Sequence, residues 1–420
     1  MKLNEQVLSY KDDMVQFLSD LVKIPSLEAE PKPGMPFGQN CYEALQFALR
    51  KAESLGFQTG NVDGYAGYIE AGQGEKEMGV LVHLDVVPAG QGWSVEPFGG
   101  IIQDNRVYGR GSIDNKSALA AALYALKALC DTQPDFKTRV RIIMGCNEET
   151  GMNCLKYYRD HVQMPDYAFS PDASYPIINT EKGSMFVRFT KPCSQKGTAG
   201  TWHIVSGEAG EYANVVPSIA TLQLTGGDLR ELETAVAAYA KENGFEMDFA
   251  ANGDTGVITA HGVGAHGSTP EEGKNALGML CGLIQQLDMA DGDVEKGMAA
   301  IAKYIGMEYD GKSAGIKLED ASGPLTCNLG VLRADREGIS FTIDIRHPIS
   351  YEHEDIIKIL DTSFGPEGFV SEMPHESPNH SVPADHPLVK ALLKVYEEQT
   401  GKEGYCISIG GGTYARVMPN

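Results

Sequence analysis

The sequence predicts an α/β protein, in which a mostly parallel sheet carries helices on both faces and an α+β domain is inserted into the chain. Three observations support this fold class. Before residue 180, apolar strand-like runs alternate with helix-forming segments, which is typical of parallel strands joined by crossover helices. From about residue 181 the strands become shorter and alternate in polarity. From Pro387 onward, a helix and a strand resume the first pattern.

The length of 420 residues favours two or more domains, because a single hydrophobic core rarely grows to that size. We predict that the main domain has a first part at residues 1–180 and a second part at residues 384–420. The insert at residues 181–383 is long enough for two α+β lobes.

Periodicity and propensity predict the elements of the first part. Apolar residues at helical spacing, among them Phe17 and Leu21, predict an N-terminal helix, and residues 41–54 are amphipathic. Apolar runs predict strands at 79–84, 139–144 and 167–169. The alanine- and leucine-rich segment 117–129 predicts a helix between the first two of these strands.

The insert and the C-terminal part follow in the same way. Alternating polarity predicts strands at 184–190 and 338–346, and helical spacing predicts helices at 228–242 and 271–287. Thr269 and Glu272 form a capping-box pattern at the start of the second of these helices. A helix at 387–401 and a strand at 405–413 end the chain.

Composition argues against several classes of partner. The formal net charge of -22 at pH 7 repels phosphates, which argues against nucleic acid and anionic membranes. The longest apolar stretch, 119–129, contains Lys127 and is too short to span a bilayer, and the N-terminus has no uninterrupted apolar signal region. Eight scattered cysteines without a Cys-x-x-Cys pair favour reduced thiols. We therefore predict a cytoplasmic protein that binds neither nucleic acid nor a membrane.

Imidazole and carboxylate side chains gather where the predicted strands end or the following helix begins. Because parallel strands have their carboxyl ends at one edge of the sheet, we expect these side chains to lie close together. They are His83, Asp85, Asp114, Glu148, Glu149 and Asp172.

A set of one imidazole and several carboxylates without thiolates suits zinc, cobalt or manganese, and crowded acids need a cation to offset their repulsion. His83 is then a metal ligand, and Asp85 accepts a hydrogen bond from its other ring nitrogen. Each residue alone has an ordinary explanation, such as a loop pair, an N-cap or a solvated turn, so the hypothesis depends on their conjunction. The sequence has no phosphate-loop, nucleotide-binding or Gly-x-Ser-x-Gly pattern that would favour a rival chemistry.

The motifs around these residues resemble a known family. LVHLDVVPAGQGW, GRGSIDNKS, CNEETG and SPDASYP occur in this order, together with EYANVVPS, AHGSTPEEGKNA, DIRHP and GGGTYAR. The chain is similar in these motifs to the dinuclear zinc exopeptidases that include carnosinases, aminoacylases and bacterial non-specific dipeptidases, and it most resembles the bacterial dipeptidase branch.

The resemblance implies roles for the candidate residues. His83 and Asp172 would bind one zinc ion, Glu149 would help bind the other, and Asp114 would bridge both. Glu148 would be the general base. The insert would be a lid on the catalytic domain. Its substrate-binding residues, with two from the C-terminal loop, would be Asn214, His266, Arg346, Gly412 and Thr413.

These roles predict metal-dependent hydrolysis of dipeptides. Glu148 would take a proton from water activated by two metal ions and return it to the leaving amine. His266 would donate to the oxyanion, although on its own it could equally be a loop histidine. Arg346, otherwise a surface ion pair, would bind the C-terminal carboxylate of the substrate and so limit its length.

The chain departs from the family in one respect. The family takes a histidine ligand of the second zinc from beyond the GGGTYAR loop, and no histidine follows His386 here. We therefore expect a shortened chain, or a partner that supplies what is missing, with a weak second metal site and possible impairment of activity. We expect a monomer, with association possible through the truncated edge of the sheet.

Two other functions stay open at this point. A related deacylase or aminoacylase would use the same metal site with another lid pocket. A non-catalytic peptide-binding remnant would keep the cleft without turnover. Release of two amino acids from a dipeptide distinguishes the first prediction from the deacylase, and absence of any metal-dependent hydrolysis would support the remnant.

Overall fold

The computed structural model describes residues 2–418, which divide by their internal packing into two compact units. Unit 1 runs as far as Tyr175 and takes up the chain again at Gly412, and unit 2 is Pro176–Gly411. Residues 384–411 are thus grouped with unit 2. Their assignment to the same domain as the N-terminal residues stays a prediction.

The sheet of unit 1 has five strands in the order β1-β2-β6-β3-β7, and it confirms the α/β class. Strands β6, β3 and β7 are parallel, and β1 and β2 join them as an antiparallel hairpin at one edge. The apolar run at the start of the metal-ligand motif forms β3 and is buried along most of its length. The bounds are β1 Gln58–Val62, β2 Ala66–Ala71, β3 Glu77–His83, β6 Arg139–Gly145 and β7 Tyr167–Phe169.

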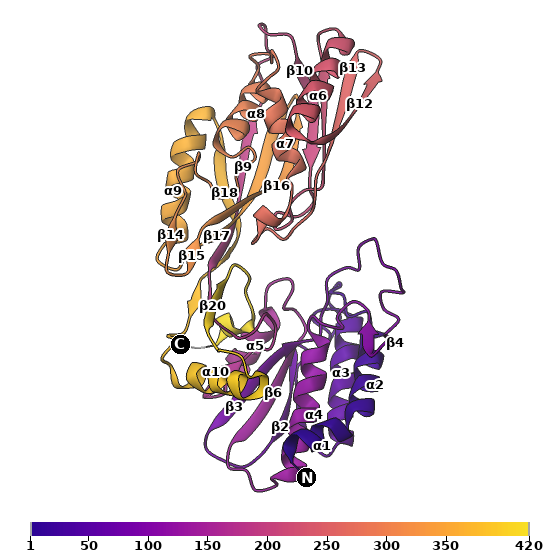
Figure 1. The fold of residues 1–420 in the computed structure, drawn as a ribbon. Coiled ribbons are helices and arrows are strands. Elements are labelled where there is room, and N and C mark those ends of the chain that lie inside the picture. Colours follow the sequence, from indigo (N-terminus) through magenta and orange to yellow (C-terminus); the bar gives the residue numbers. More distant parts are fainter. Residues whose placement is uncertain (1, 419–420) are drawn as a thin grey trace. The chain divides into compact units, whose positions relative to one another are not determined.

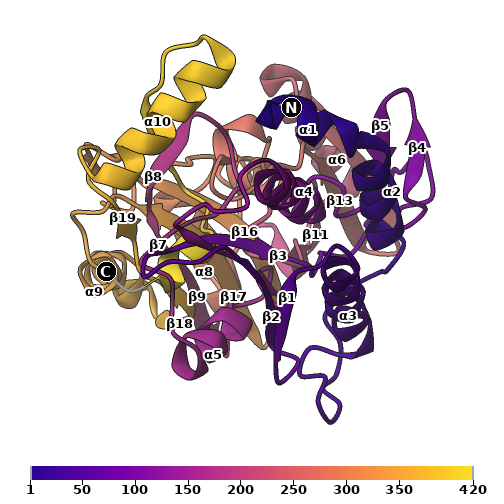
Figure 2. The same ribbon diagram turned by 90° about the horizontal axis from the view of Figure 1, so that it is seen from below.

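Helices cover both faces of this sheet, as predicted. An added Cβ at Gly67 would lie 2.8 Å from Leu45 of α3, whereas one at Gly145, on the opposite face, would lie 2.8 Å from the Cys154 sulfur of α5. Helix α4 packs on β3 and β6 beside α2, and Figures 1 and 2 show the arrangement. The helices are α1 Leu3–Ser9, α2 Lys11–Val22, α3 Gln39–Ser54, α4 Lys116–Thr132 and α5 Asn153–His161. A short hairpin (β4 Ile101–Gln103, β5 Arg106–Tyr108) and the 3-10 turn η3 (Tyr414–Val417) complete the described part of unit 1.

Unit 2 is built on one antiparallel sheet of eight strands in the order β12-β13-β11-β10-β16-β17-β9-β18. The strands predicted at 184–190 and 338–346 are β9 and β17, which pair along their whole length. The continuous sheet has one hydrophobic core, and a division into two lobes stays a prediction. The bounds are β9 Gly183–Pro192, β10 His203–Ala209, β11 Ile219–Thr225, β12 Glu246–Asn252, β13 Thr255–His261, β16 Thr326–Asp335, β17 Gly338–His347 and β18 Val370–Ser377.

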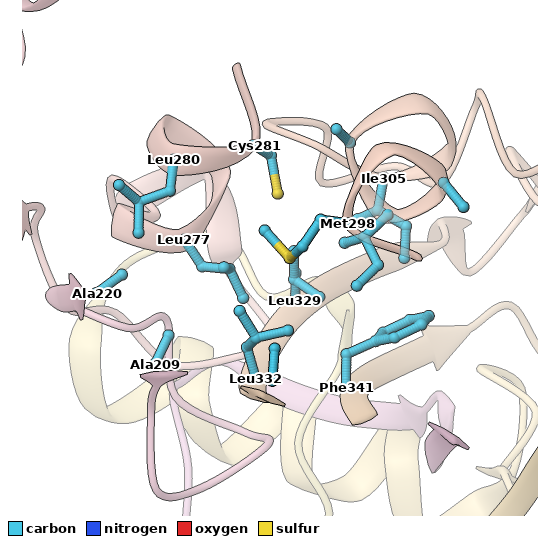
Figure 3. Close-up of a cluster of buried hydrophobic side chains, with 14 of the residues drawn as sticks. Ala209, Ala220, Leu277, Leu280, Cys281, Met298, Ile305, Leu329, Leu332 and Phe341 are labelled. Atoms are coloured by element: carbon cyan, nitrogen blue, oxygen red, sulfur yellow. The ribbon is translucent and has the colours of Figure 1, made fainter. Parts of the chain in front are cut away.

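Four helices pack on this sheet and bury its apolar side chains. Figure 3 shows Leu277 and Met298, from two of the helices, above Leu332 and Phe341 of the sheet. The alternation of buried and partly buried residues along β11 and β13 has the period of two that a half-buried strand requires. The helices are α6 Leu229–Asn243, α7 Ala276–Ile284, α8 Asp293–Tyr304 and α9 His353–Phe364.

The prediction of a helix at 271–287 is wrong about where the helix begins. Residues Pro270–Glu272 form the 3-10 turn η1, and α7 begins at Ala276, where the Asn275 side chain accepts a hydrogen bond from the Gly278 N–H. The physical reason lies in tertiary pairing. Lys274 exchanges two backbone hydrogen bonds with Val263, at 2.9 and 2.8 Å, which holds it extended and prevents an earlier helical turn.

The rest of unit 2 includes a small sheet in which β8 (Ile177–Glu181) lies between β19 (His380–Ser381) and β20 (Cys406–Ile409). The strand predicted at 405–413 is shorter in the structure, where only Cys406–Ile409 forms β20. The helix predicted at 387–401 is present as α10, Pro387–Thr400. The pair β14 (Glu319–Asp320) and β15 (Gly323–Pro324) and the turn η2 (Gly365–Glu367) are the remaining described elements. Within residues 2–418, the helices are too short or too polar to cross a membrane, and all eight cysteines are free.

Candidate active site

The predicted metal ligands of unit 1 come together at the carboxyl ends of its parallel strands. His83 ends β3, Asp114 lies just before α4, and Asp172 follows β7. Glu148 and Glu149 follow β6. The structure therefore confirms that these side chains, which are up to 89 residues apart in the chain, share one edge of the sheet.

His83 lies at the centre of this group and is almost fully buried, with 1% of its surface exposed. Its Nε2 is 2.9 Å from Oδ1 of Asp114 and 3.5 Å from Oδ2 of Asp172. Its Nδ1 is 3.0 Å from the backbone carbonyl oxygen of Asp85. Because a carbonyl oxygen only accepts, Nδ1 carries a proton, so in the neutral ring Nε2 presents its lone pair to the two carboxylates. This is the orientation that a metal-binding imidazole needs.

Asp85 is buried beside His83, where the sequence predicts a carboxylate that holds the ring. The Nδ1 of His83 lies 3.0 Å from the backbone carbonyl oxygen of Asp85 and 3.5 Å from the Asp85 carboxylate, so the carbonyl is the closer acceptor. The carboxylate also accepts the Glu149 N–H at 3.0 Å. Asp85 thus links the ring of His83 to the loop that carries Glu149, a second contact that the sequence does not predict.

Two overlapping groups of side chains could each hold a metal ion. In the groups His83–Asp114–Glu149 and His83–Glu148–Asp172, one ligand atom from each member lies within 4.8 Å of the others. The donors are one imidazole nitrogen and carboxylate oxygens, which suits zinc, cobalt or manganese. Glu148, predicted as the general base, therefore lies beside the predicted ligands.

The protonation equilibria of the site indicate an excess of negative charge. Burial raises the pKa of Glu148 to about 8, and the carboxylate of Asp172 contributes in the same direction. Burial also raises the pKa of Glu149 to about 7, with Asp114 contributing. Burial opposes the His83 imidazolium, but the hydrogen bonds that it donates to neighbouring carboxylates outweigh burial and raise the pKa of His83 well above its usual value. Without a cation, the site can hold its charge only by taking up protons.

The structure also shows a buried amide that the sequence pattern does not predict. The Asn115 side chain, 1% exposed, donates from Nδ2 to the carboxylate of Asp172 and, at 3.2 Å, to the carbonyl of Pro171. The Oδ1 of Asn115 accepts a hydrogen bond from the backbone N–H of His83 at 3.3 Å. One side chain therefore connects two predicted ligands. Its position directly after Asp114 in GRGSIDNKS is the signal that could have indicated it.

A second amide shapes the loop of the two glutamates. Asn147, also buried, accepts the Asn153 N–H at 2.9 Å and donates to Glu28 at 3.0 Å. It also donates to the hydroxyl of Thr150. These bonds close the loop around Glu148 and Glu149 onto the start of α5, so the two carboxylates are carried by a tethered segment.

Gly412 and Thr413 belong to unit 1, directly before η3. Thr413 uses its hydroxyl to accept the Ala415 N–H at 3.2 Å, which caps this turn. The next residue, Tyr414, is fully buried, with its hydroxyl 2.9 Å from the sulfur of Cys154 and its ring edge-on to His83. The segment is thus anchored behind the imidazole of the site. A direct role of Gly412 and Thr413 in substrate binding stays a prediction.

In unit 2 the structure brings Asn214, His266 and Arg346 into one neighbourhood. The Gly267 N–H donates to the Asn214 carbonyl at 2.7 Å. An added Cβ at Gly267 would lie 2.4 Å from Oδ2 of Asp344, so glycine permits this close approach. Asp344 in turn holds Arg346, and the three predicted residues are therefore connected through Gly267 and Asp344.

Arg346 is 8% exposed and its partner Asp344 is fully buried, so their contact is not a surface ion pair. Nε and Nη2 of Arg346 donate to the two carboxylate oxygens at 2.8 Å each, and Nη1 donates to the Gly410 carbonyl at 3.0 Å. Burial raises the pKa of Asp344, and Arg346 opposes this. These contacts use three of the five N–H donors, and one donor on each terminal nitrogen is not engaged by them.

His266 is exposed and has its Nδ1 close to Ser268, 2.6 Å from the hydroxyl and 3.1 Å from the backbone nitrogen. Partial burial of the ring lowers the pKa of His266, and the nearby Arg346 cation contributes in the same direction. The ring is therefore biased toward its neutral form.

Comparison with known proteins identifies the family. Residues 79–420 match the family described as peptidase family M20/M25/M40. The chain belongs to this family. It is 36% identical over 422 residues to "Putative dipeptidase YtjP" of Bacillus subtilis (strain 168), covering 100% of this chain and 90% of that protein. It is 33% identical over 423 residues to the Beta-Ala-Xaa dipeptidase of Lactobacillus delbrueckii subsp. lactis, with coverage of 100% and 89%.

A solved structure supports the fold. Human carnosine dipeptidase 1 aligns with a TM-score of 0.58 at 15% identity, over 99% of this chain and 88% of the other. At this identity the likeness concerns the fold alone. Family membership itself confirms the resemblance predicted from the motifs, and with it the prediction that this M20 protein is an enzyme, a hydrolase of the metallopeptidase type.

Proposed function

We propose that this M20 protein is a dipeptidase that cleaves the peptide bond with water activated at a two-metal centre. The observation that carries the proposal is the pair of overlapping ligand groups around His83, one of which includes Glu148. The names of the relatives at 33–36% identity point to the same substrate class. We also propose a monomeric, cytoplasmic enzyme whose partner is a small peptide.

The residues present fit two divalent cations, and we propose zinc, with cobalt or manganese as alternatives. His83 and Asp172 would hold one ion and Glu149 the other, with Asp114 shared between them. When bound, the metal pair lowers the pKa of water toward neutrality and polarises the peptide carbonyl. The raised pKa values of Glu148 and Glu149 support this assignment, because a crowded buried set of acids is compensated by cations.

Glu148 is suited to move the proton during the reaction. Burial raises the pKa of Glu148 to about 8 in the metal-free protein. Bound cations would keep this carboxylate ionised, and its buried surroundings would make it a ready acceptor of a proton from water. It then delivers this proton to the amine that leaves. Asp85 and Asn147 hold the loop of Glu148 through the Glu149 N–H and the start of α5, which limits the motion of the base.

Unit 2 supplies donors that suit the rest of the substrate. We propose that the terminal nitrogens of Arg346 bind the C-terminal carboxylate, a contact that a charge-assisted pair of hydrogen bonds makes specific. His266 would donate to the oxyanion of the transition state, and Asn214 would assist substrate binding. Such a clamp on the C-terminal carboxylate would favour a dipeptide over longer chains.

The test uses the full chain loaded with zinc, and compares Glu148→Gln with Glu233→Gln, which alters an exposed residue on α6. We expect Glu148→Gln to keep its metal content and to lose about 10²–10⁴-fold in kcat, as for other general bases. Glu233→Gln should match the unaltered protein. Loss of metal with unchanged activity per bound ion would instead exchange the roles of Glu148 and Glu149.

The substrate class is tested in the same assay. Dipeptides should release two amino acids faster than N-acyl amino acids release their acyl group. Preference for the N-acyl substrates would refute the dipeptidase assignment in favour of a deacylase. Absence of metal-dependent hydrolysis with either substrate would refute an enzymatic role.

A further inference from the structure

The imidazole of His266 has one nitrogen engaged within its own loop. The Ser268 backbone N–H points at Nδ1 from 3.1 Å, and the Ser268 hydroxyl oxygen lies 2.6 Å from the same nitrogen. Both contacts lie inside unit 2. The other ring nitrogen, Nε2, takes no part in either contact.

These two contacts determine where the proton of the neutral ring lies. A backbone N–H is a donor only, so Nδ1 must present its lone pair and cannot carry a proton. The Ser268 hydroxyl can rotate to donate to the same lone pair. The single proton of the neutral imidazole therefore resides on Nε2.

The loop itself holds the Ser268 N–H in this direction. The Thr269 N–H donates to the His266 carbonyl at 3.0 Å, which closes a turn over residues 266–269. Gly267 is pinned by its bond to the Asn214 carbonyl and has no space for a side chain against Asp344. On the other side, Ser268 packs against Gly410, where an added Cβ would lie 2.8 Å from the Ser268 Cβ. The donor is thus built into a tightly packed backbone.

We propose that Ser268 is a positioning residue that fixes His266 in the neutral tautomer with its proton on Nε2, so that this nitrogen is a permanent hydrogen-bond donor. The inference rests on the proposed function in one respect, because the oxyanion of peptide hydrolysis is the acceptor that such a donor would serve. A donor that needs no reorientation during the reaction stabilises the developing charge better than a mobile one.

The environment of His266 supports this role. Its pKa is lowered by partial burial and by Arg346, so the neutral ring, in which the tautomer matters, predominates at neutral pH. The alternative tautomer would place an Nδ1–H against the Ser268 N–H, with two donors facing each other. It would also leave Nε2 as an acceptor, which would repel an oxyanion instead of binding it.

The test is ¹⁵N NMR of the full-length protein with labelled histidine, at a pH where the ring is neutral. The His266 signals are assigned by their loss in His266→Gln. His261, whose Nε2 lies 2.9 Å from the Asp248 carboxylate, is the internal reference. The unaltered protein should show Nδ1 unprotonated and Nε2 protonated. Ser268→Ala removes the hydroxyl and keeps the backbone N–H, so Nδ1 should stay unprotonated while the ring becomes more mobile. Ser268→Thr should restore the fixed ring, and His261 should stay unchanged in all variants.

Kinetics on dipeptides gives the second readout. Ser268→Ala should lower kcat roughly tenfold with little change in KM, a fraction of the 10²–10³-fold loss expected when an oxyanion donor is removed outright. Ser268→Thr should recover most of the rate. A proton on Nδ1 in the unaltered protein, or an unchanged ring mobility and kcat in Ser268→Ala, would overturn the proposal. If the unaltered protein hydrolyses no dipeptide, the proposed function fails, and the NMR result still decides the tautomer.

Discussion

Removing the metal should make the stability of this protein fall as the pH rises from about 5 to 8. Three groups of the site act in the same direction. The folded-state pKa of Glu148 is about 8 and that of Glu149 about 7, against 4.5 for an ordinary glutamate, so the unfolded chain releases these protons first. The stability associated with both protons is present below pH 4.5 and is lost as the pH rises through the folded values. His83, whose pKa is also raised, contributes stability below its ordinary value of 6.5 that is lost as the pH rises further.

The magnitude follows from the size of the pKa shift. One pKa unit corresponds to about 1.36 kcal/mol, so Glu148 alone accounts for a loss of about 4–5 kcal/mol between pH 4.5 and pH 8. Glu149 adds less, because its shift is smaller and because the ionisation of one carboxylate disfavours that of the other. Against a total stability of about 5–15 kcal/mol for a typical domain, this is a large part. Bound cations favour the ionised carboxylates, so the metal-loaded protein should show little of this slope.

The assay follows urea unfolding of the full chain at pH 5, 6, 7 and 8, with a chelator or with zinc. The sequence contains two tryptophans, and Trp93 is the one in unit 1, so a Trp202→Phe background makes fluorescence report on that unit. In this background Glu148→Gln should remove at least half of the metal-free slope, whereas the matched surface change Glu233→Gln should leave it intact. A metal-free stability that rises with pH, or a slope that is equal in Glu148→Gln, would refute the reasoning.

Three further predictions concern the substrate and the metal. Arg346→Ala should raise KM for dipeptides and weaken the preference for short substrates, and equal cleavage of free-acid and amidated dipeptides by the unaltered protein would contradict the clamp. Asn115→Ala should weaken metal binding by about 10–100-fold, as for other groups that orient ligands, when measured by calorimetry against Asn153→Ala at the start of α5. Calorimetric titration of the metal-free protein should resolve one tight and one weaker ion, because His83, Asp114 and Asp172 offer a three-residue set. Two equally tight ions would count against this ligand assignment.

The gathering of the metal ligands could be predicted from the sequence because it depends on a general rule of topology. Apolar runs locate β3, β6 and β7 by local pattern alone, and parallel strands end at a common edge. His83, Glu148 and Asp172 then meet although they are far apart in the chain. Their environment, and hence the raised pKa values, follows from burial at that edge.

Hydrogen bonds that depend on loop geometry could not be predicted in this way. The preference of His83 Nδ1 for the carbonyl of Asp85 over its carboxylate is a matter of 0.5 Å. The side chain of Asn115 reaches His83 and Asp172 only because the turn before α4 places it between them. The start of α7 was predicted too early for a similar reason, since the pairing of Lys274 with Val263 overrides the local helical pattern.

The ion pair Asp344–Arg346 could be predicted only in part from the sequence. It also affects how the protein would select a substrate. The two residues are two positions apart on β17 and so share one face of the strand, a signal that the sequence contains. Because Asp344 offsets the charge of Arg346, the pair can be buried without a net charge, which an isolated guanidinium could not be at acceptable cost. The attraction of Arg346 for a substrate carboxylate then depends on the direction of its terminal N–H groups more than on net charge. Selectivity should accordingly depend on the shape and position of the carboxylate and respond weakly to ionic strength.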